Sequence, residues 1–332
     1  MSKKVRVVQM GLGPIGNKAT QYLLERANLE IVGAIDADPA KAGKDVAELA
    51  GLAPIGVKVT ADIEAALAGK QVDVVLLTTT STMAKIQNQL LSLLPFGVNI
   101  VSSCEELSYP WLTEPQMAKQ IDEMAQKHGV SVLATGVNPG FLMDFLPLIM
   151  TGVCRNVRQV TVERIQDATF RRIPFQKKIG AGLTQEQFAA KVKEGVLRHV
   201  GLTESIQMIA TKLGWQLEKT EDVISPVIAH GPVKMDHVTI EPGQVLGVQQ
   251  IGRGIVAGKE AISLFFRAAI GEAESRDRIV IDGDPAIDSC IKGGVNGDVA
   301  TCAVLVNAIP TVINARPGLR TIADIEPVSC YK

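Results

Sequence analysis

Gly11-Leu12-Gly13-Pro14-Ile15-Gly16 is the stretch of sequence that predicts the fold. It lies between the apolar run Val5 to Met10 and a helical pattern that begins near Ile15, which is the context of the dinucleotide-binding motif G-x-G-x-x-G. The first glycine permits a tight turn, the second lets the backbone approach a pyrophosphate, and the third lets helix and strand pack closely. N–H groups at the helix start would bind the phosphates, and Pro14 suits this place because it needs no N–H. The alternative is that these glycines only shape a turn.

An acidic residue follows the second apolar run at the distance expected of the same motif. Asp36 stands about 20 residues after Gly16, where an acid accepts hydrogen bonds from the adenosine ribose. This position favours NAD as the cofactor. Lys41 and Lys44 follow closely and could neutralise a ribose phosphate, so NADP stays open.

The first 140 residues alternate β-branched runs with longer helical patterns, which is typical of β-α-β units around a parallel sheet. The predicted strands are Val5 to Met10, Glu30 to Ile35, Val72 to Leu77, Val98 to Val101 and Val130 to Ala134. The predicted helices are Asn17 to Ala27, Ala61 to Leu67, Met83 to Leu94 and Pro115 to His128. We therefore expect an α/β protein with a Rossmann dinucleotide-binding domain.

The pattern changes after Pro139-Gly140, where a second domain of α+β type with a mainly antiparallel sheet is expected. Its predicted strands are Val157 to Arg164, His237 to Ile240 and Arg278 to Ile281, and its predicted helices are Gln185 to Leu197 and Glu204 to Leu213. The apolar helical stretch Asp298 to Asn314 predicts a return to the first domain. The expected domains are residues 1–139 with 298–332 and residues 140–297.

Composition excludes several classes of function. The 34 Lys and Arg against 35 Asp and Glu give a net charge of −1, which argues against nucleic-acid or anionic-membrane binding. No apolar run reaches the length of a membrane span, and the first residues do not form a secretory signal. The five cysteines and four histidines show no metal-ligand spacing, so we expect a cytoplasmic protein without a metal.

Small hydroxyl residues follow two of the predicted strands. Thr78-Thr79-Thr80-Ser81 and Ser102-Ser103-Cys104 would lie beyond the carboxyl ends of a parallel sheet, where a dinucleotide passes. Helix capping by Thr and Ser explains them nearly as well.

Two carboxylates, Glu105 and Glu106, come next, close to the expected nicotinamide position. Such a group could hold an ammonium or iminium ion, or act as an acid or base. The alternative is that these acids stabilise the start of a helix. The pattern does not say which one points inward.

Four stretches of the sequence together resemble the 2,4-diaminopentanoate dehydrogenase family, which includes the native amine dehydrogenases and is distantly similar to dihydrodipicolinate reductase. They are Gly11 to Gly16, Ile35 to Asp45, Ser102 to Pro110 and Gly136 to Phe141. The likeness extends to Arg171 to Gly182 and to Gly293 to Thr301, and so covers nearly the whole chain.

The resemblance implies an NAD- or NADP-dependent enzyme for the reversible oxidative deamination of an amine, which is the reductive amination of a ketone or aldehyde with ammonia. In this family a glutamate of the matched motif binds the substrate nitrogen. That role is carried over to Glu105, with Glu106 as the alternative. The family's substrate pocket suggests Asn138, Phe141 and Met143, although packing explains Met143 better. Asn138 and Cys104 also join the candidate cofactor-binding residues Gly11, Gly13, Pro14, Ile15, Gly16, Asp36, Thr78, Thr79, Thr80 and Ser81.

Other interpretations remain open at this point. The basic residues Arg164, Arg171, Arg172, Lys177 and Lys178 could recognise a substrate carboxylate, bind cofactor phosphate or form a hydrated surface. Lys177 and Lys178 also keep open an imine or aldehyde reductase similar to dihydrodipicolinate reductase or homoserine dehydrogenase. A protein that senses NAD(P) without turnover is the non-enzymatic alternative. The fold resemblance implies a homodimer, in which Val157 to Arg164 and His237 to Gln250 would offer the surface.

Overall fold

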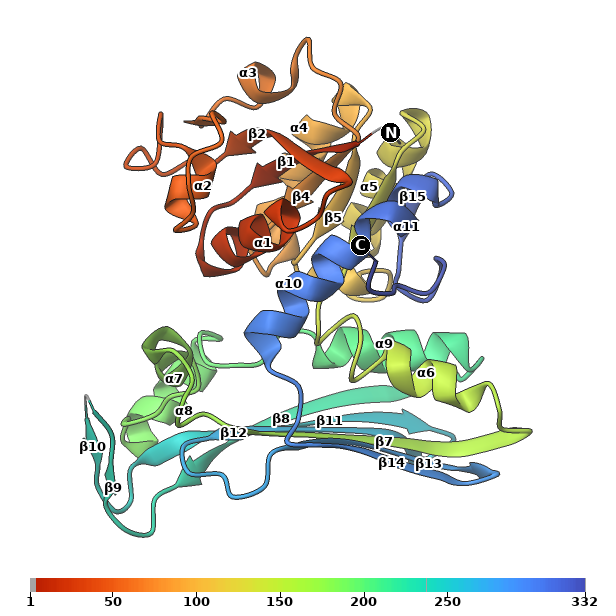
Figure 1. The fold of residues 1–332 in the computed structure, drawn as a ribbon. Helices are drawn as coiled ribbons and strands as arrows, with labels where there is room; N and C mark the ends of the chain where they lie inside the picture. The colour runs from red at the N-terminus through yellow and green to blue at the C-terminus, as the bar shows by residue number, and fades with distance from the viewer. Residues whose placement is uncertain (1–3, 237, 332) are drawn as a thin grey trace. The chain divides into compact units, whose positions relative to one another are not determined.

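The computed structural model describes residues 4–236 and 238–331, and the chain divides into two compact units (Figure 1). The first unit consists of Met1–Phe141 and Asn296–Lys332, and the second of Leu142–Val295. The first boundary lies after residue 141 and not after residue 139, and the second lies before residue 296 and not before residue 298. Each boundary therefore differs from the prediction by two residues. The expected His237 strand start lies outside the described residues.

The first unit contains a seven-stranded sheet in the order β15-β6-β5-β4-β1-β2-β3, and every neighbouring pair is parallel. The strand order reverses at β1, which lies between β4 and β2, and ligands of open parallel sheets bind beyond such a point. The strands are β1 (Val5–Met10), β2 (Leu29–Ile35), β3 (Val59–Thr60), β4 (Val74–Leu77), β5 (Asn99–Ser102), β6 (Ser131–Ala134) and β15 (Gly318–Arg320).

Helices cover both faces of this sheet, and its central strands are largely apolar and buried. Residues of α3 (Ile63–Leu67), α4 (Met83–Leu93) and α5 (Pro115–Lys127) share one buried apolar cluster with the strands. The α1 helix (Pro14–Leu24) packs with α10 (Gly297–Asn307), while α11 (Ile309–Asn314) contacts β5 and β6. The short elements of this unit are α2 (Val46–Leu49), η1 (Leu94–Phe96) and η2 (Glu106–Ser108).

The apolar stretch near the C-terminus belongs to the first unit, as the sequence predicts. By length and composition residues 297–314 would suffice to cross a membrane, a criterion that core helices of soluble proteins also meet. In the structure the stretch forms two successive helices, with Pro310 in the first turn of α11. Asn296 caps α10 by accepting hydrogen bonds from the backbone N–H groups of Asp298 and Val299.

The second unit contains a six-stranded sheet in the order β14-β13-β7-β12-β11-β8. All neighbours are antiparallel except β7 and β12, so the sheet is mainly antiparallel, as predicted. A separate two-stranded sheet pairs β9 with β10. The strands are β7 (Asn156–Asp167), β8 (Lys219–Ile228), β9 (Val233–Lys234), β10 (Thr239–Ile240), β11 (Val245–Val256), β12 (Lys259–Ala269), β13 (Arg276–Asp284) and β14 (Ile287–Lys292).

The helices of this unit lie over one face of the six-stranded sheet (Figure 1). They are α6 (Phe145–Thr151), α7 (Ile173–Lys178), α8 (Gln185–Lys193) and α9 (Leu202–Lys212). Gly252 of β11 leaves room for α9, because a Cβ there would lie 2.9 Å from the Cδ1 of Ile206. No helix among the described residues of the unit covers the opposite face (Figure 1).

Candidate active site

The glycine motif forms a tight junction between β1 and α1. Gly11 adopts φ +90°, a left-handed conformation that favours glycine. A Cβ on Gly16 would lie 1.9 Å from the carbonyl oxygen of Gly11, so the third glycine is required for the close approach of α1 to the loop. The first and third glycines therefore act as the motif predicts.

The middle glycine faces open space. A Cβ on Gly13 would meet nothing within 4 Å, and Gly13 is the N-cap of α1 without a side chain to cap it. Pro14 follows in the first turn, and that turn contains no acidic residue. Because N–H groups and the positive end of the helix dipole remain available there, the bare backbone fits a pyrophosphate.

The side chains of Gln9 and Thr78 hold the glycine loop in place through hydrogen bonds to the Gly11 carbonyl oxygen. The amide of Gln9 donates to the carbonyl oxygen of Gly11 at 3.0 Å and to the hydroxyl of Thr78 at 2.9 Å. The Thr78 hydroxyl in turn donates to the same Gly11 oxygen at 2.8 Å. Thr78 thus positions the loop that would hold the cofactor. Gln9 is fully buried within an otherwise mostly apolar strand, and nothing in the strand pattern predicts its role.

Asp36 lies at the end of β2 and organises three donors. Its Oδ2 accepts hydrogen bonds from the Leu12 backbone N–H at 2.7 Å and from the Lys41 ammonium at 2.9 Å, and its Oδ1 accepts from the Asp38 N–H at 2.9 Å. Partial burial by itself would raise the pKa of Asp36, but these hydrogen bonds outweigh it and hold the pKa below its usual value. The carboxylate is therefore ionised at neutral pH.

The remaining hydroxyl residues after β4 serve mainly local contacts. Thr79 donates to the side-chain oxygen of Gln89 on α4 at 2.7 Å, and the Thr80 hydroxyl accepts from the Thr82 N–H at 3.4 Å. The carbonyl oxygen of Ser81 accepts from the Glu106 N–H at 3.2 Å. These contacts belong to a turn and to the side of α4, whereas the capping role considered for these residues is not seen, because Thr82 is the N-cap of α4 and makes no side-chain cap hydrogen bond.

The two adjacent glutamates have different surroundings. The Glu106 carboxylate accepts a hydrogen bond from the Met83 N–H at 2.8 Å, at the first residue of α4. An acid at a helix start is favourable, and this is the structural alternative considered for the pair. Glu105, by contrast, lines a small pocket of about 40 Å³ in the first unit.

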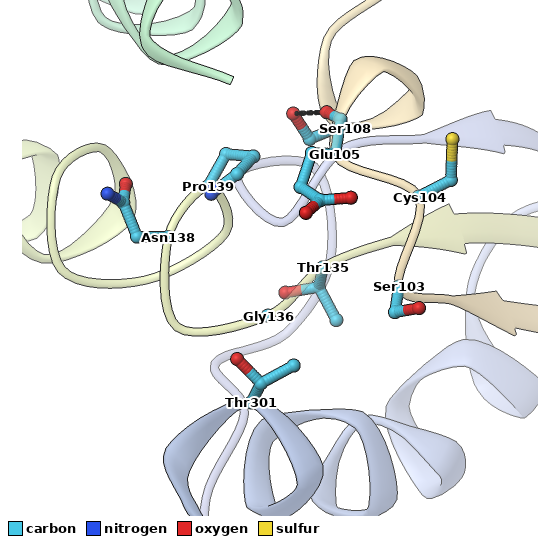
Figure 2. A pocket seen from close by; sticks show the side chains of 9 residues that line it. All are labelled: Ser103, Cys104, Glu105, Ser108, Thr135, Gly136, Asn138, Pro139 and Thr301. Carbon is cyan, nitrogen blue, oxygen red and sulfur yellow. Dashed lines mark hydrogen bonds between the residues drawn. The ribbon is translucent and has the colours of Figure 1, made fainter. Parts of the chain in front are cut away.

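Figure 2 shows the Glu105 carboxylate pointing into the middle of this pocket, towards the loop that follows β6. The Glu105 backbone is fixed by the Ser108 hydroxyl, which donates to its carbonyl oxygen at 2.7 Å. The lining residues come from the loops after β5 and β6 and from α10: Ser103, Cys104, Glu105, Ser108, Thr135, Gly136, Asn138, Pro139 and Thr301. Glu105 is the only acid among them.

The loop after β6 is wound tightly against α10. Gly140 adopts φ +116°, and a Cβ there would lie 2.5 Å from the backbone nitrogen of Gly136. The Thr301 hydroxyl of α10 accepts a hydrogen bond from the Val137 N–H at 3.3 Å. Thr301 thus joins the two ends of the first unit at the pocket. The sequence pattern does not predict this role, although Thr301 lies in a stretch that carries the family resemblance.

Cys104 is nearly fully buried beside Glu105. Its thiol points away from the Glu105 carboxylate (Figure 2). Burial, together with the neighbouring Glu105 and Glu106 carboxylates, raises the pKa of Cys104. The side chain is therefore a neutral thiol at ordinary pH.

The predicted substrate-binding residues do not all share this pocket. Asn138 lines it, whereas Phe141 and Met143 are not among its lining residues. Phe141 is the last residue of the first unit before the crossing, and Met143 belongs to the second unit, where it is fully buried. Complete burial fits the packing role considered for Met143.

The basic residues named from the sequence in the second unit differ in burial and in partners. Arg164 is buried and forms an ion pair with Asp277 at 2.6 Å, and these contacts favour a structural role over the other roles considered for it. Arg171 donates to Gln166 at 3.1 Å and lies over the Phe175 ring. Lys177 and Lys178 are exposed in the last turn of α7.

His199 stacks on Phe266 with a centroid distance of 4.4 Å. Burial, with the nearby charges of Lys178 and Arg164, lowers the pKa of His199 to about 3. In residues 4–236 and 238–331, no group of three or more His, Cys, Asp or Glu side chains could hold a metal ion.

Two family models match this chain, and together they cover most of it. The C-terminal domain of 2,4-diaminopentanoate dehydrogenase matches residues 141–331, and the N-terminus of dihydrodipicolinate reductase matches residues 5–104. The 2,4-diaminopentanoate dehydrogenase of Acetoanaerobium sticklandii is 34% identical over 332 residues, which cover 97% of this chain and 94% of that protein. The chain belongs to the 2,4-diaminopentanoate dehydrogenase family.

Two further proteins are similar to this chain over nearly its whole length. The amine dehydrogenase of Streptomyces virginiae is 24% identical over 97% of this chain and 96% of its own length. The solved structure of the amine dehydrogenase from Mycobacterium smegmatis shares the fold, with a TM-score of 0.87 and 23% identity over 99% of this chain and 98% of that one. The chain is an NAD(P)-dependent oxidoreductase of the amine dehydrogenase type, as the sequence predicts.

Proposed function

We propose that this dehydrogenase catalyses the reversible oxidative deamination of a primary amine and that Glu105 binds the reacting nitrogen. The observation that carries the proposal is the different orientation of the two glutamates. The Glu106 carboxylate accepts a hydrogen bond at the start of α4. Glu105, by contrast, is the only acid among the described residues that line the pocket beyond β5 and β6. An ionised carboxylate there would attract an ammonium or iminium group and repel an anionic one.

In the proposed reaction the hydride is exchanged with the cofactor, and the side chains of the protein bind the substrate and stabilise its charge. In the oxidative direction a hydride leaves the amine carbon and an iminium ion remains, which water converts to a ketone or aldehyde with release of ammonia. When bound at the glycine loop, NAD(P) supplies the hydride acceptor, and NAD(P)H supplies the donor in the reverse direction. Glu105 stabilises the positive charge of the iminium nitrogen, and Thr301 and the loop 135–140 hold the opposite wall.

The test is a reductive amination assay with the full chain. Reduced cofactor, ammonia and a panel of ketones and aldehydes are mixed with the enzyme, and the loss of reduced nicotinamide absorbance is followed. Ammonia-dependent oxidation supports the proposal. Oxidation that is independent of ammonia would instead favour an imine or aldehyde reductase, and cofactor binding without any turnover would favour a sensor.

The substrate panel should contain a diamino acid and its keto counterpart beside simple amines and ketones. The Acetoanaerobium sticklandii relative is named for 2,4-diaminopentanoate, whose carboxylate needs a cationic partner. Arg164 does not provide it, because Asp277 already pairs with it inside the second unit. Preference for a simple ketone over the keto acid would show that a substrate carboxylate is not required.

We further propose that the enzyme is a homodimer formed through the second unit. Val223, Ile251 and Phe265 are paired across β8, β11 and β12 and so share one face of the sheet. Gly252, the next residue of β11, faces α9. Because successive residues of a strand point to opposite faces, Ile251 and its two partners lie on the face without helices. Of the two segments named from the sequence, Val157 to Arg164 lies in β7 and residues 245–250 lie in β11 of this sheet, whereas Thr239–Ile240 forms β10 of the separate two-stranded sheet.

The measurement for this surface is molar mass by light scattering after size exclusion. We expect twice the chain mass for the natural protein and a monomer for Phe265→Glu, because a buried charge there would oppose association. A monomeric natural protein would contradict the dimer.

We also propose a cytoplasmic location. Five cysteines are present, and none of the described residues forms a disulfide. This arrangement fits a reducing compartment. Fractionation of the producing cell would test it, and recovery of the protein outside the cytoplasm would contradict it.

A further inference from the structure

Asp36, the acid at the position expected to bind the adenosine ribose, forms an ion pair with Lys41. The Lys41 ammonium lies 2.9 Å from the Asp36 Oδ2, and the same oxygen accepts the Leu12 N–H at 2.7 Å. The side chains of Asp36 and Lys41 are 11% and 24% exposed, so the pair is sheltered but still open to a ligand. The ribose-binding edge therefore carries a paired charge.

This pairing changes what an acid at this position does. A lone carboxylate at the end of the second strand accepts hydrogen bonds from the ribose hydroxyls and repels a 2′-phosphate. Here the Asp36 carboxylate already accepts three hydrogen bonds from its own chain, and the positive charge of Lys41 offsets its negative charge. A carboxylate can accept about four hydrogen bonds, so one place remains for a ribose hydroxyl.

Lys41 is held at this edge by the local backbone. The Lys41 N–H donates to the carbonyl oxygen of Asp38 at 3.0 Å, which closes a turn. Its ammonium also lies 3.8 Å from the Asp38 carboxylate, which is about half exposed and more strongly screened by water. Lys44, the second lysine of the segment, is exposed, and it is Lys41 and not Lys44 that forms the ion pair with Asp36.

We infer that Lys41 determines cofactor selectivity: its ammonium allows the site to accept the ribose 2′-phosphate of NADP, while Asp36 retains its use for the ribose hydroxyl of NAD. The enzyme accordingly accepts both cofactors. This inference rests on the dinucleotide site of the proposed function but not on its amine chemistry.

The experiment measures the dissociation constants of NADPH and NADH by nucleotide fluorescence, with no substrate present. We expect Lys41→Met to weaken NADPH binding by about tenfold or more and NADH binding by less than about threefold, because only NADPH loses a charge-assisted contact. The matched control Lys44→Met should leave the ratio of the two constants nearly unchanged. In the natural protein, the affinity for NADPH relative to NADH should fall as salt is added, because salt screens the attraction between Lys41 and the 2′-phosphate.

A second variant separates selectivity from damage to the loop. Asp36→Asn keeps an oxygen acceptor for Leu12 but removes the charge, and it should weaken NADH relative to NADPH. The inference is overturned if Lys41→Met leaves the ratio unchanged, or if Lys44→Met shifts it as much. Binding of neither nucleotide by the natural protein would overturn the dinucleotide site itself, whereas normal binding without amination would overturn only the amine chemistry.

Discussion

The Glu106 carboxylate accepts the backbone N–H of Met83 at 2.8 Å, and this bond distinguishes it from its neighbour Glu105. Because a side chain bonded to the first residue of a helix stabilises that helix, the main effect of Glu106 is on stability. Glu105 lines the pocket, and within residues 4–236 and 238–331 its carboxylate makes no such bond to a helix start. The two adjacent acids should therefore respond differently to the same substitution.

We predict that Glu105→Ala lowers the rate of amination by about 100-fold or more, since it removes electrostatic stabilisation of a cation, and leaves the melting temperature nearly unchanged. Glu106→Ala should instead lower the free energy of unfolding by about 1 kcal/mol through the loss of its bond to α4. Steady-state kinetics and urea unfolding of both variants provide the measurements. Equal loss of turnover in the two variants would contradict the assignment.

The glycine motif gives a second matched pair. Gly16→Ala places a Cβ 1.9 Å from the Gly11 carbonyl oxygen, so the loop must shift, and we expect a stability loss of about 2 kcal/mol or more together with weaker nucleotide binding. Gly13→Ala meets no protein atom within 4 Å and should fold normally. Its effect should appear only in the dissociation constant of the nucleotide. Normal stability in Gly16→Ala would show that the junction is less tight than described.

The buried ion pair of the second unit predicts a strong effect on stability. Arg164 and Asp277 are each 3% exposed, and together they hold Val295: Arg164 donates to its carbonyl oxygen and Asp277 accepts its N–H. Arg164→Met should cost about 3–5 kcal/mol, because it leaves a buried carboxylate without its partner. Adding Asp277→Asn should recover part of this loss. A double-mutant cycle in urea measures the coupling, and a value near zero would be inconsistent with a buried pair.

His199 predicts how stability depends on pH. Its pKa is about 3 in the folded protein, because burial and the charges of Lys178 and Arg164 disfavour the imidazolium, and about 6.5 when unfolded. Between these values only the unfolded chain binds the proton, so stability falls as the pH drops below about 6.5. At pH 5 the expected loss from this residue is about 2 kcal/mol.

The corresponding measurement is urea unfolding of the natural protein and of His199→Gln from pH 7.5 to 4.5. The variant has no titrating ring and should lose less stability over that interval. Identical slopes for the two proteins would mean that His199 does not titrate as described.

The sequence predicts the first unit well because its signals are local. The strand from Val5 to Met10 is found with the same bounds, and the glycine spacing identifies the loop that follows it. The α1 helix begins at Pro14, next to the helix start expected near Ile15 and three residues before the range Asn17 to Ala27. Four other strands of this sheet agree with prediction to within two residues.

The second unit was harder to predict because its strands pair over long distances. β8, β12 and β14 were not expected, and Gln185 to Leu197 ends as a helix at Lys193. In β11 the glycines at 247, 252 and 254 interrupt the apolar alternation that reveals a strand, yet they are required where the sheet approaches its neighbours. The choice between Glu105 and Glu106 likewise depends on the contact with Met83, which lies 23 residues earlier in the chain.

The last strand of the chain has a consequence for biosynthesis. β15 completes the edge of the first sheet beside β6, and α10 brings Thr301 to the pocket, so this unit includes both ends of the chain. A ribosome that has made only the first 141 residues has therefore produced an unfinished nucleotide-binding unit with an unpaired β6 edge. The final segment closes that edge only after the intervening unit has been translated.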